Sequence, residues 1–470
     1  MTVGLRSASS SHTAANIKRV LYYGTFIHTP KLGSLQVFTD TGFVVDKNGV
    51  IDNIYENTSV EEILNKETNI EETFDISKNS NSFFFPGFID THIHAPQYPN
   101  NGIFGSSTLL DWLETYTFPL ESTLKDLDKA RLVYNKVISR GISHGTTCAA
   151  YYATIDTDAT NLLADLALEK GQRAFIGKVC MNNNSPEYYC ETFEQSKKST
   201  LDVIDHIKEI DPSNEIVAPI LTPRFAPSCT SELLNWLGHL REEQNLHCQT
   251  HISENKNEIK WVQELFPSSK SYTDVYNDHN LLGDKTILAH AIHLSDHEKD
   301  LIKSTGTGIS HCPISNSSIT SGEARVRWLL DNEIPVGLGT DVSGGFSISI
   351  LETARQALLV SNHLAMKTSD HNKLSVEDVL FLATLGGAKV VGLQDKLGSF
   401  IKGKKWDAQL VDLDSKGSPV DVFDWQTSPK SMNTSDDLTK FKNLVAKWVF
   451  NGDDRNTQKV WVNGLKVHEL

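Results

Sequence analysis

Residues 85–94 read Phe-Pro-Gly-Phe-Ile-Asp-Thr-His-Ile-His, so an apolar stretch ends in two histidines, His92 and His94, with one residue between them. Side chains two positions apart point the same way on a β-strand, so both imidazoles can reach one metal ion. On a helix the two side chains would diverge. The aromatic residues before the pair favour a strand, and the Pro-Gly step excludes a helix through this point. We therefore predict a strand that ends in half of a metal site.

The composition is that of an ordinary globular protein with a large core, since 39% of the 470 residues are hydrophobic and 22% are charged. The 59 acidic residues outnumber the 44 basic ones, and no stretch combines clustered Lys and Arg with aromatic residues. Nucleic acid and anionic membrane surfaces require such clusters. No apolar run approaches the roughly 20 residues that span a bilayer. We therefore expect a small-molecule partner, neutral or cationic, and neither nucleic acid nor membrane.

The six cysteines are scattered along the chain, and no two of them form a Cys-x-x-Cys pair. The sequence therefore predicts neither a disulfide framework nor a zinc site built from thiolates. Reduced thiols are typical of the cytosol. We accordingly expect a cytoplasmic protein.

The middle of the chain alternates short apolar strands with helical stretches, a pattern typical of βα units and a parallel sheet. Eight candidate strands occur, which is the number that closes a (β/α)8 TIM barrel. We therefore predict an α/β fold with such a barrel. The candidate strands are residues 83–94, 146–152, 173–181, 217–225, 247–254, 286–294, 306–313 and 336–342.

Both chain ends carry short β patterns, at residues 19–56 and again at 408–413 and 459–464. We expect these segments to form a small β-sandwich into which the barrel is inserted. Residues 414–437, rich in Ser, Asp and Pro, indicate a loop. The expected division is a flexible N-terminal segment over residues 1–18, a composite β-sandwich over 19–80 and 400–470, and a barrel over 81–399.

Residues able to bind a metal lie at the ends of the candidate barrel strands, where active sites of such barrels occur. Besides the first pair, the fifth strand carries His251, the sixth His290 and the eighth Asp341. A single buried histidine is usually a hydrogen-bonded core residue, and Asp341 alone could cap a turn. Several imidazoles together with one carboxylate instead indicate a first-row metal, with zinc favoured over magnesium or calcium.

Glu254 follows His251 by three residues, just beyond the same strand end. A carboxylate at this position can stand above a metal without binding it and can transfer protons as a general acid or base. The alternative is a solvated loop glutamate, which is the usual environment of this residue type. We favour the catalytic interpretation.

Taken together, the strand-end motifs and the residues around them resemble the amidohydrolase superfamily and, within it, the guanine deaminases of eukaryotic type. The superfamily motifs alone imply metal-dependent hydrolysis. Gln97-Tyr98 and Arg224-Phe225 are the pairs that point to guanine. One departure is Ile314, where relatives often carry Asn. The likeness rests on residues 86–98, 222–225, 251–255, 310–313 and 339–345.

The resemblance implies a role for each candidate residue. One zinc ion would be held by His92, His94, His251 and Asp341. Catalysis would use Glu254, His290 and Asp341, with His290 as hydrogen-bond donor to the reacting oxygen. The substrate would be contacted by Gln97, Trp112, Arg224, Phe225, His251 and Glu254, and His311 would have a supporting role.

The resemblance also implies the reaction, which is hydrolytic deamination of guanine to xanthine and ammonia by hydroxide that zinc supplies. Two-metal relatives bridge their ions with a carbamylated lysine on the fourth strand, and residues 215–223 contain no lysine. We therefore expect one zinc per chain, and a homodimer as in relatives. The alternatives are a mononuclear amidohydrolase that acts on another ring, such as a triazine or an adenosine-type substrate, and a catalytically silent scaffold that binds partners.

Overall fold

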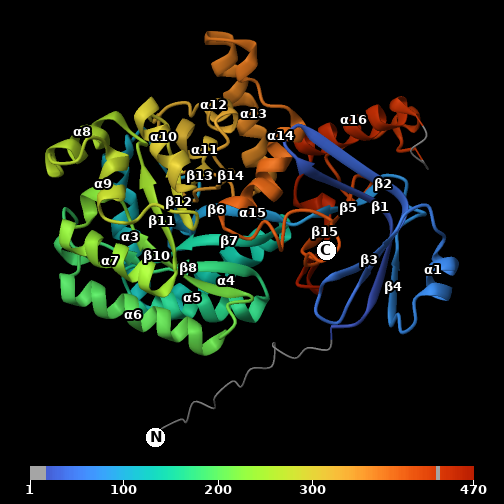
Figure 1. The fold of residues 1–470 in the computed structure, drawn as a ribbon, viewed down its shortest axis with the longest axis horizontal. Coiled ribbons are helices and arrows are strands. Elements are labelled where there is room, and N and C mark those ends of the chain that lie inside the picture. Colours follow the sequence, from blue (N-terminus) through green and yellow to red (C-terminus); the bar gives the residue numbers. More distant parts are fainter. Residues whose placement is uncertain (1–16, 430–433) are drawn as a thin grey trace, which may run out of the picture.

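The computed structural model describes residues 17–429 and 434–470, and Figure 1 shows a barrel beside a separate β-sheet. The flexible segment expected over residues 1–18 lies outside the described residues except for its last two positions. Among the described helices, none is both long and apolar enough to cross a membrane. The expected α/β barrel is confirmed, and the chain ends expected to form a small β-sandwich form a separate mixed sheet.

The barrel is built from eight parallel strands, and each of the eight candidate strands contains one of them. Beyond the last strand, the Asp341 amide donates to the His92 carbonyl (2.9 Å), and the His94 amide donates to the Val342 carbonyl (3.2 Å). These bonds join the eighth segment to the first and bring their ends together. The strands are β6 (Phe88–His94), β7 (Thr146–Tyr152), β8 (Arg173–Gly177), β10 (Val217–Pro223), β11 (His247–Ile252), β12 (Thr286–His290), β13 (Gly308–His311) and β14 (Val336–Leu338), with the short β9 (Val179–Cys180) paired to β10.

Helices surround the barrel (Figure 1), and their ends follow from local sequence signals. Helix α5 begins after Asp156, whose side chain accepts the Ala159 amide, and ends at Gly171 in the left-handed conformation. The helices around the barrel are α4 (Leu127–Ser143), α5 (Thr157–Lys170), α6 (Phe193–Ile210), α7 (Ser231–Gln244), α8 (Lys256–Leu265), α9 (Tyr272–Asp278), α10 (Asp296–Thr305), α11 (Pro313–Ser318), α12 (Val326–Asp331), α13 (Ile350–Lys367), α14 (Val376–Phe381) and α15 (Gly387–Val390).

The strands from the two chain ends form one mixed sheet of eight strands, in the order β17-β16-β15-β5-β1-β2-β3 with β4 paired to β1. Aromatic side chains fill its core, where the Tyr22 and Trp406 rings stack with centroids 4.2 Å apart. The strands are β1 (Val20–Lys31), β2 (Ser34–Val45), β3 (Ile51–Tyr55), β4 (Glu72–Asp75), β5 (Ser82–Pro86), β15 (Ala408–Asp412), β16 (Thr457–Val462) and β17 (Leu465–Glu469).

Four further helices lie outside the ring around the barrel. Helix α16 begins within the segment expected to be a loop over residues 414–437, and residues 430–433 of that segment lie outside the described part of the chain. A single π-helical turn (Leu113–Thr117) joins α2 to α3. The four helices are α1 (Val60–Lys66), α2 (Leu109–Trp112), α3 (Phe118–Ser122) and α16 (Ser435–Asn451).

The segment over residues 83–94, expected as one strand, contains two strands that belong to different sheets. Strand β5 pairs with β15 in the terminal sheet, whereas β6 pairs with β7 in the barrel. At the junction the Gly87 amide donates to the backbone carbonyl of Asp407 (2.9 Å), and the Phe88 amide donates to the backbone carbonyl of Gly145 (2.8 Å). The Pro-Gly step therefore carries the chain from one sheet to the other, directly before the histidine pair.

We expect Gly87→Ala to destabilise the protein by about 1–3 kcal/mol, because an added methyl group would overpack this junction. A Cβ at this position would lie 2.2 Å from side-chain atoms of Thr147. The shift of the urea denaturation midpoint measures the effect. Gly141→Ala is the matched control, since its Cβ would lie in helix α4 with its nearest neighbour 3.5 Å away. Equal midpoints for the two variants would contradict a tight junction at Gly87.

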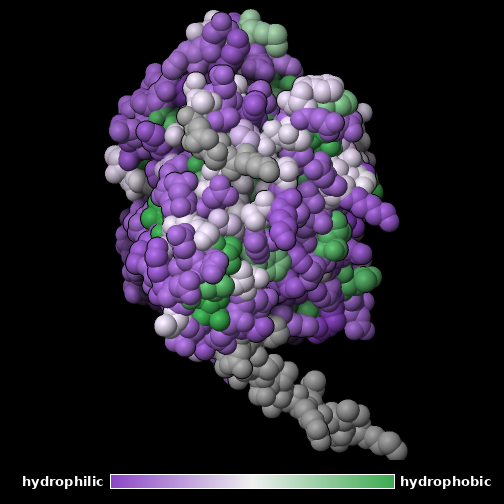
Figure 2. All heavy atoms as spheres, turned by 90° about the vertical axis from the view of Figure 1, so that its right-hand side faces the viewer, coloured by the Kyte–Doolittle hydropathy of each residue, from purple (hydrophilic) through white to green (hydrophobic). Residues whose placement is uncertain are grey.

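Figure 2 shows the side of the molecule that the terminal sheet and α16 occupy in Figure 1. The visible surface is mostly hydrophilic, and its hydrophobic residues occur in small separate groups. Large continuous apolar patches are the usual mark of a stable protein interface. The part of this face that Figure 2 displays carries no such patch among the described residues.

Candidate active site

The residues predicted from the strand ends converge at the carboxyl end of the barrel. His92 and His94 lie on β6, His251 lies on β11, His290 ends β12, and Asp341 follows β14. All are buried except His251, which is partly exposed. His290 and Asp341 have φ angles of 72° and 47°, in the left-handed region that non-glycine residues rarely adopt. Such backbone is held in place by its surroundings and is common at active sites.

The side-chain atoms of four of these residues have the spacing of ligands around one ion. His94 Nε2 lies 3.2 Å from His251 Nε2, and Asp341 Oδ1 lies 3.1 Å from His92 Nε2 and 3.4 Å from His94 Nε2. Ligands at the usual Zn–N distance of about 2.0–2.1 Å in a tetrahedron are about 3.3 Å apart. These three distances are compatible with ligand atoms around one metal ion, and a catalytic ion would need a further position for water beside the four side chains.

His290 also belongs to this cluster but faces the other oxygen of the carboxylate. Ligand atoms of His92, His251, His290 and Asp341 all lie within 4.8 Å of one another. His290 Nε2 lies 3.7 Å from Asp341 Oδ2, whereas Oδ1 faces the other histidines. Its Nδ1–H donates to the Asn316 side-chain oxygen (2.8 Å). His290 therefore lies within reach of the same cluster but faces a different oxygen of the carboxylate.

The protonation of the imidazoles separates His290 from the other three. Burial lowers the pKa of His92, His94 and His251 below the usual range, so these rings are neutral, as metal ligands must be. Burial also opposes charge on His290, but the carboxylates of Glu254 and Asp341 outweigh it and raise its pKa. A charged imidazole donates hydrogen bonds from both nitrogens and cannot bind a metal. The electrostatics therefore favour a donor role for His290.

The orientation of His251 is fixed through its other nitrogen. Its Nδ1–H donates to the backbone carbonyl of Arg224 (2.6 Å), which leaves the lone pair of Nε2 directed at the other ligand atoms. Metal-binding histidines usually have such a hydrogen-bonded second nitrogen, because it sets the tautomer. The carbonyl belongs to one of the predicted substrate-binding residues, so the two parts of the site share a backbone segment.

Glu254 is buried next to His290, with Oε2 lying 3.5 Å from His290 Nε2. Ser321 donates to its other oxygen (3.2 Å). Burial raises the pKa of the Glu254 carboxyl to about 7. Both the protonated and the ionised form are therefore present near neutral pH, which is the property of an efficient general acid or base.

The segment that carries Glu254 is fixed by Glu258, which the sequence did not single out. The buried Glu258 carboxylate accepts the backbone amides of Glu254 (2.9 Å) and Asn255 (3.1 Å), and the Tyr272 hydroxyl donates to it (2.8 Å). Glu258 also serves in the capping box of α8. The capping box can be recognised in the sequence, whereas the hydrogen bond from the Glu254 amide to Glu258 cannot.

The predicted substrate-binding residues line one small cavity together with the metal-site side chains. Its volume is about 30 Å³. The apolar side is formed by Leu109, Trp112, Leu113, Phe225 and Ile319, and the polar side by His94, Gln97, Arg224, His251, Glu254, Glu258, His290 and Asp341.

The comparisons with known proteins identify the family of this chain. The amidohydrolase family model matches residues 83–467. A probable guanine deaminase of Schizosaccharomyces pombe is 49% identical, over 95% of this chain and 83% of that protein, and the guanine deaminase of Dictyostelium discoideum is 44% identical, over 95% and 98%. A crystal structure of guanine deaminase from C. acetobutylicum with bound guanine in the active site superimposes with a TM-score of 0.83 and 33% identity, over 95% of this chain and 99% of that one. The chain belongs to the amidohydrolase family, among the guanine deaminases.

The most important residue that sequence reasoning missed in this amidohydrolase is Glu121, on helix α3. It is 1% exposed and forms a bidentate ion pair with Arg224, at 2.7 and 3.1 Å. No motif surrounds it, and an isolated glutamate is normally solvated. The one available signal was indirect, because a buried arginine requires a carboxylate partner.

His311 lies buried at the end of β13, and neither of its ring nitrogens has a hydrogen-bond partner among the described residues. Burial lowers its pKa to about 3, so the ring is neutral. It does not line the cavity that holds the other predicted residues. Its expected supporting role therefore stays a prediction.

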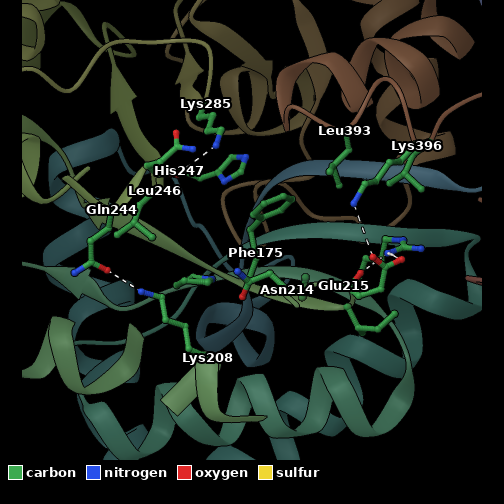
Figure 3. Close-up of a pocket in the computed structure, with 17 residues that line it drawn as sticks. Phe175, Lys208, Asn214, Glu215, Gln244, Leu246, His247, Lys285, Leu393 and Lys396 are labelled. Atoms are coloured by element: carbon green, nitrogen blue, oxygen red, sulfur yellow. Dashed lines mark hydrogen bonds and ion pairs between the residues drawn. The ribbon is translucent and has the colours of Figure 1, made fainter. Parts of the chain in front are cut away.

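A second cavity, of about 330 Å³, opens at the opposite end of this amidohydrolase barrel, near the starts of β8, β10 and β11 (Figure 3). Two of its four cations already have these partners: Lys208 donates to Gln244 (2.8 Å), and Lys396 lies 3.8 Å from Glu215. Active sites of such barrels lie at the carboxyl ends of the strands. The cavity in Figure 3 therefore belongs to the structural end of the barrel.

Proposed function

We propose that this protein hydrolyses guanine to xanthine and ammonia with one zinc ion per chain. The observation that carries this proposal is the position of Arg224 and Gln97, which line the same cavity as three of the four proposed metal ligands, His94, His251 and Asp341. The guanine deaminases among its relatives support the same substrate. The function follows from this site rather than from the barrel, which many unrelated enzymes share.

Zinc is favoured by the donor set of three neutral imidazoles and one carboxylate, in His92, His94, His251 and Asp341. Asp341 suits this role because it stays ionised. Burial opposes ionisation of the carboxyl, but the neighbouring histidines, of which His92 has the largest effect, outweigh burial and lower the pKa of Asp341. When bound, zinc lowers the pKa of water to about 7 and so supplies hydroxide at neutral pH.

The residues above the metal site handle the protons of the reaction. Asp341 Oδ2, which faces His290, accepts a proton from the attacking water. The carbon C2 of guanine is poorly electrophilic until N3 gains a proton, and Glu254 delivers that proton. His290 donates a hydrogen bond to the oxygen that becomes attached to C2. Asp341 then passes its proton to the amino group, the remaining proton of the attacking oxygen returns to Glu254 as the carbonyl forms, and ammonia leaves to give xanthine.

Guanine is recognised by the far side of the cavity. Arg224 and Gln97 hydrogen-bond the 6-carbonyl and the ring nitrogens, while Phe225 and Trp112 pack against the ring faces. Adenine lacks the 6-carbonyl, so the N–H groups of Arg224 that Glu121 does not accept would be left without an acceptor. A site built around a hydrogen bond strongly rejects analogues that cannot form it.

We expect the metal-loaded protein to convert guanine to xanthine, and a chelator to abolish this turnover. Adding about one equivalent of Zn²⁺ per chain should restore it, because the site holds one ion. Ammonia release from guanine, adenosine and a triazine, measured in parallel, separates this proposal from another ring substrate. Metal-loaded protein that forms no xanthine would overturn the proposal, and protein that binds no metal would indicate the silent scaffold.

The remaining features of the proposal rest on the same relationship. We propose a homodimer, as expected from guanine deaminase relatives, and a cytoplasmic location, which the six free cysteines support. We propose the same division of the chain as before, with residues 81–399 as the catalytic barrel and residues 19–80 with 400–470 as the composite β-layer. Light scattering of the purified protein measures its oligomeric state.

A further inference from the structure

Glu121 lies behind the two side chains proposed to recognise the purine. Arg224 donates to both of its oxygens, and Gln97 Nε2 donates to Oε1 (2.8 Å). The Tyr189 hydroxyl donates to Oε2 (2.7 Å). Each oxygen of Glu121 thus accepts two hydrogen bonds in a fully buried position. One carboxylate therefore links both recognition residues.

This carboxylate decides which way the Gln97 amide faces. Gln97 Nε2 is directed at Glu121, and its Oε1 accepts the backbone amide of Ser343 (3.2 Å). Because Nε2 carries two hydrogens and Glu121 accepts only one of them, the amide offers a ligand its second N–H as a donor. Were position 121 a hydrogen-bond donor, only the Ser343 amide would still hold this orientation, and a 180° rotation that presents the Gln97 oxygen would cost less.

Arg224 is held in the same way. Its bidentate pairing with Glu121 fixes the plane of the guanidinium, which also lies over the Phe118 ring, 5.2 Å from its centroid. Arg224 and Gln97 both line the cavity, whereas Glu121 does not. The remaining donors of the guanidinium therefore stay available to a ligand. The polar wall of the cavity consequently presents donors from two residues.

We infer that Glu121 is a positioning residue that makes this wall a donor surface and thereby selects purines with an oxygen at C6. This inference rests on the proposed function, because it concerns how the same site distinguishes its substrate. A purine with an amino group at C6 would place a donor against donors. Selection thus originates in a residue that does not line the cavity.

Glu121→Gln tests the inference, because it keeps the shape and removes the charge that orients both donors. The readout is the Kd of chelator-treated protein for guanine and for 2-aminopurine, which lacks the C6 oxygen. We expect affinity for guanine to fall about 100-fold and affinity for 2-aminopurine to fall less than about 5-fold. Tyr189→Phe, which removes one donor to Glu121 and keeps the ion pair, should shift the ratio in the same direction by a smaller factor.

Asp407→Asn is the matched control. Asp407 forms an equally buried bidentate pair with Arg173 (2.7 and 3.2 Å), at the opposite end of the barrel from the candidate active site. It should lower the melting temperature without changing the ratio of the two affinities. The inference would be overturned if Glu121→Gln left the ratio of the Kd values for guanine and 2-aminopurine unchanged, whether both affinities fell equally or neither fell. Turnover is not part of this readout, so failure of wild-type protein to form xanthine would count against the proposed function alone.

Discussion

The Glu254→Gln variant is expected to lose guanine turnover by a factor of about 100 to 10,000, which is the usual contribution of a general acid or base. Glutamine has the same shape and accepts the Ser321 hydrogen bond, but it cannot carry a proton to N3. Glu254 is not among the four side chains spaced as metal ligands, so zinc content should stay near one per chain. Steady-state kcat and metal analysis of the purified variant measure the two effects.

Glu298→Gln is a matched control for this experiment. Glu298 is also a buried carboxylate, and it caps helix α10 away from the cavity. Its loss should lower stability while kcat stays near the wild-type value. A Glu254→Gln variant with a near-normal kcat would remove Glu254 from the mechanism, and one that had lost its zinc would assign Glu254 to the metal site.

The pH dependence of turnover provides a second readout for Glu254. Burial raises the pKa of this carboxyl to about 7. Delivery of a proton to N3 requires the protonated form, which declines as the pH rises through 7. We therefore expect kcat for guanine to fall on the alkaline side of neutrality, and this limb to be missing from the residual activity of Glu254→Gln.

The barrel and the metal cluster were predictable because their signals are local. The His92/His94 pair follows an apolar stretch at strand spacing, and the other ligands stand at the ends of strands that the sequence pattern marks. Parallel barrel strands place all such ends at one rim, so strand order alone brings His251 and Asp341 to the pair. The positions of the strand ends do not show whether His290 binds the metal or donates a hydrogen bond, because this depends on its contacts with Asn316 and Glu254.

Two other features depended on tertiary contacts that no local pattern reveals. The split at Gly87 follows from pairing with residues more than 300 positions away, in β15. Glu121 lies 103 positions from Arg224, and its neighbours in the sequence carry no motif. In both cases the residue type alone is compatible with an ordinary turn or a solvated helix. Long-range pairing therefore decided what propensity and spacing could not.

Arg224→Ala should lower kcat/KM for guanine by about 1,000-fold or more, because the cavity loses the guanidinium donors for the 6-carbonyl and keeps only Gln97. It should also destabilise the protein by about 3–5 kcal/mol, since Glu121 is left as a buried charge without its ion-pair partner. Zinc content should persist, because the group of Arg224 that holds His251 is its backbone carbonyl. Guanine kinetics, urea denaturation and metal analysis measure the three effects.

Two further variants separate recognition from stability. Arg173→Ala breaks the comparable buried pair with Asp407, so it should be destabilised to a similar extent and yet keep its KM for guanine. Arg224→Lys keeps one positive charge beside Glu121 but loses the planar fork, so it should recover stability more fully than affinity for guanine. If Arg173→Ala and Arg224→Ala impaired guanine equally, the loss would reflect the fold rather than the cavity. The assignment of Arg224 to the 6-carbonyl therefore depends on the difference between these variants.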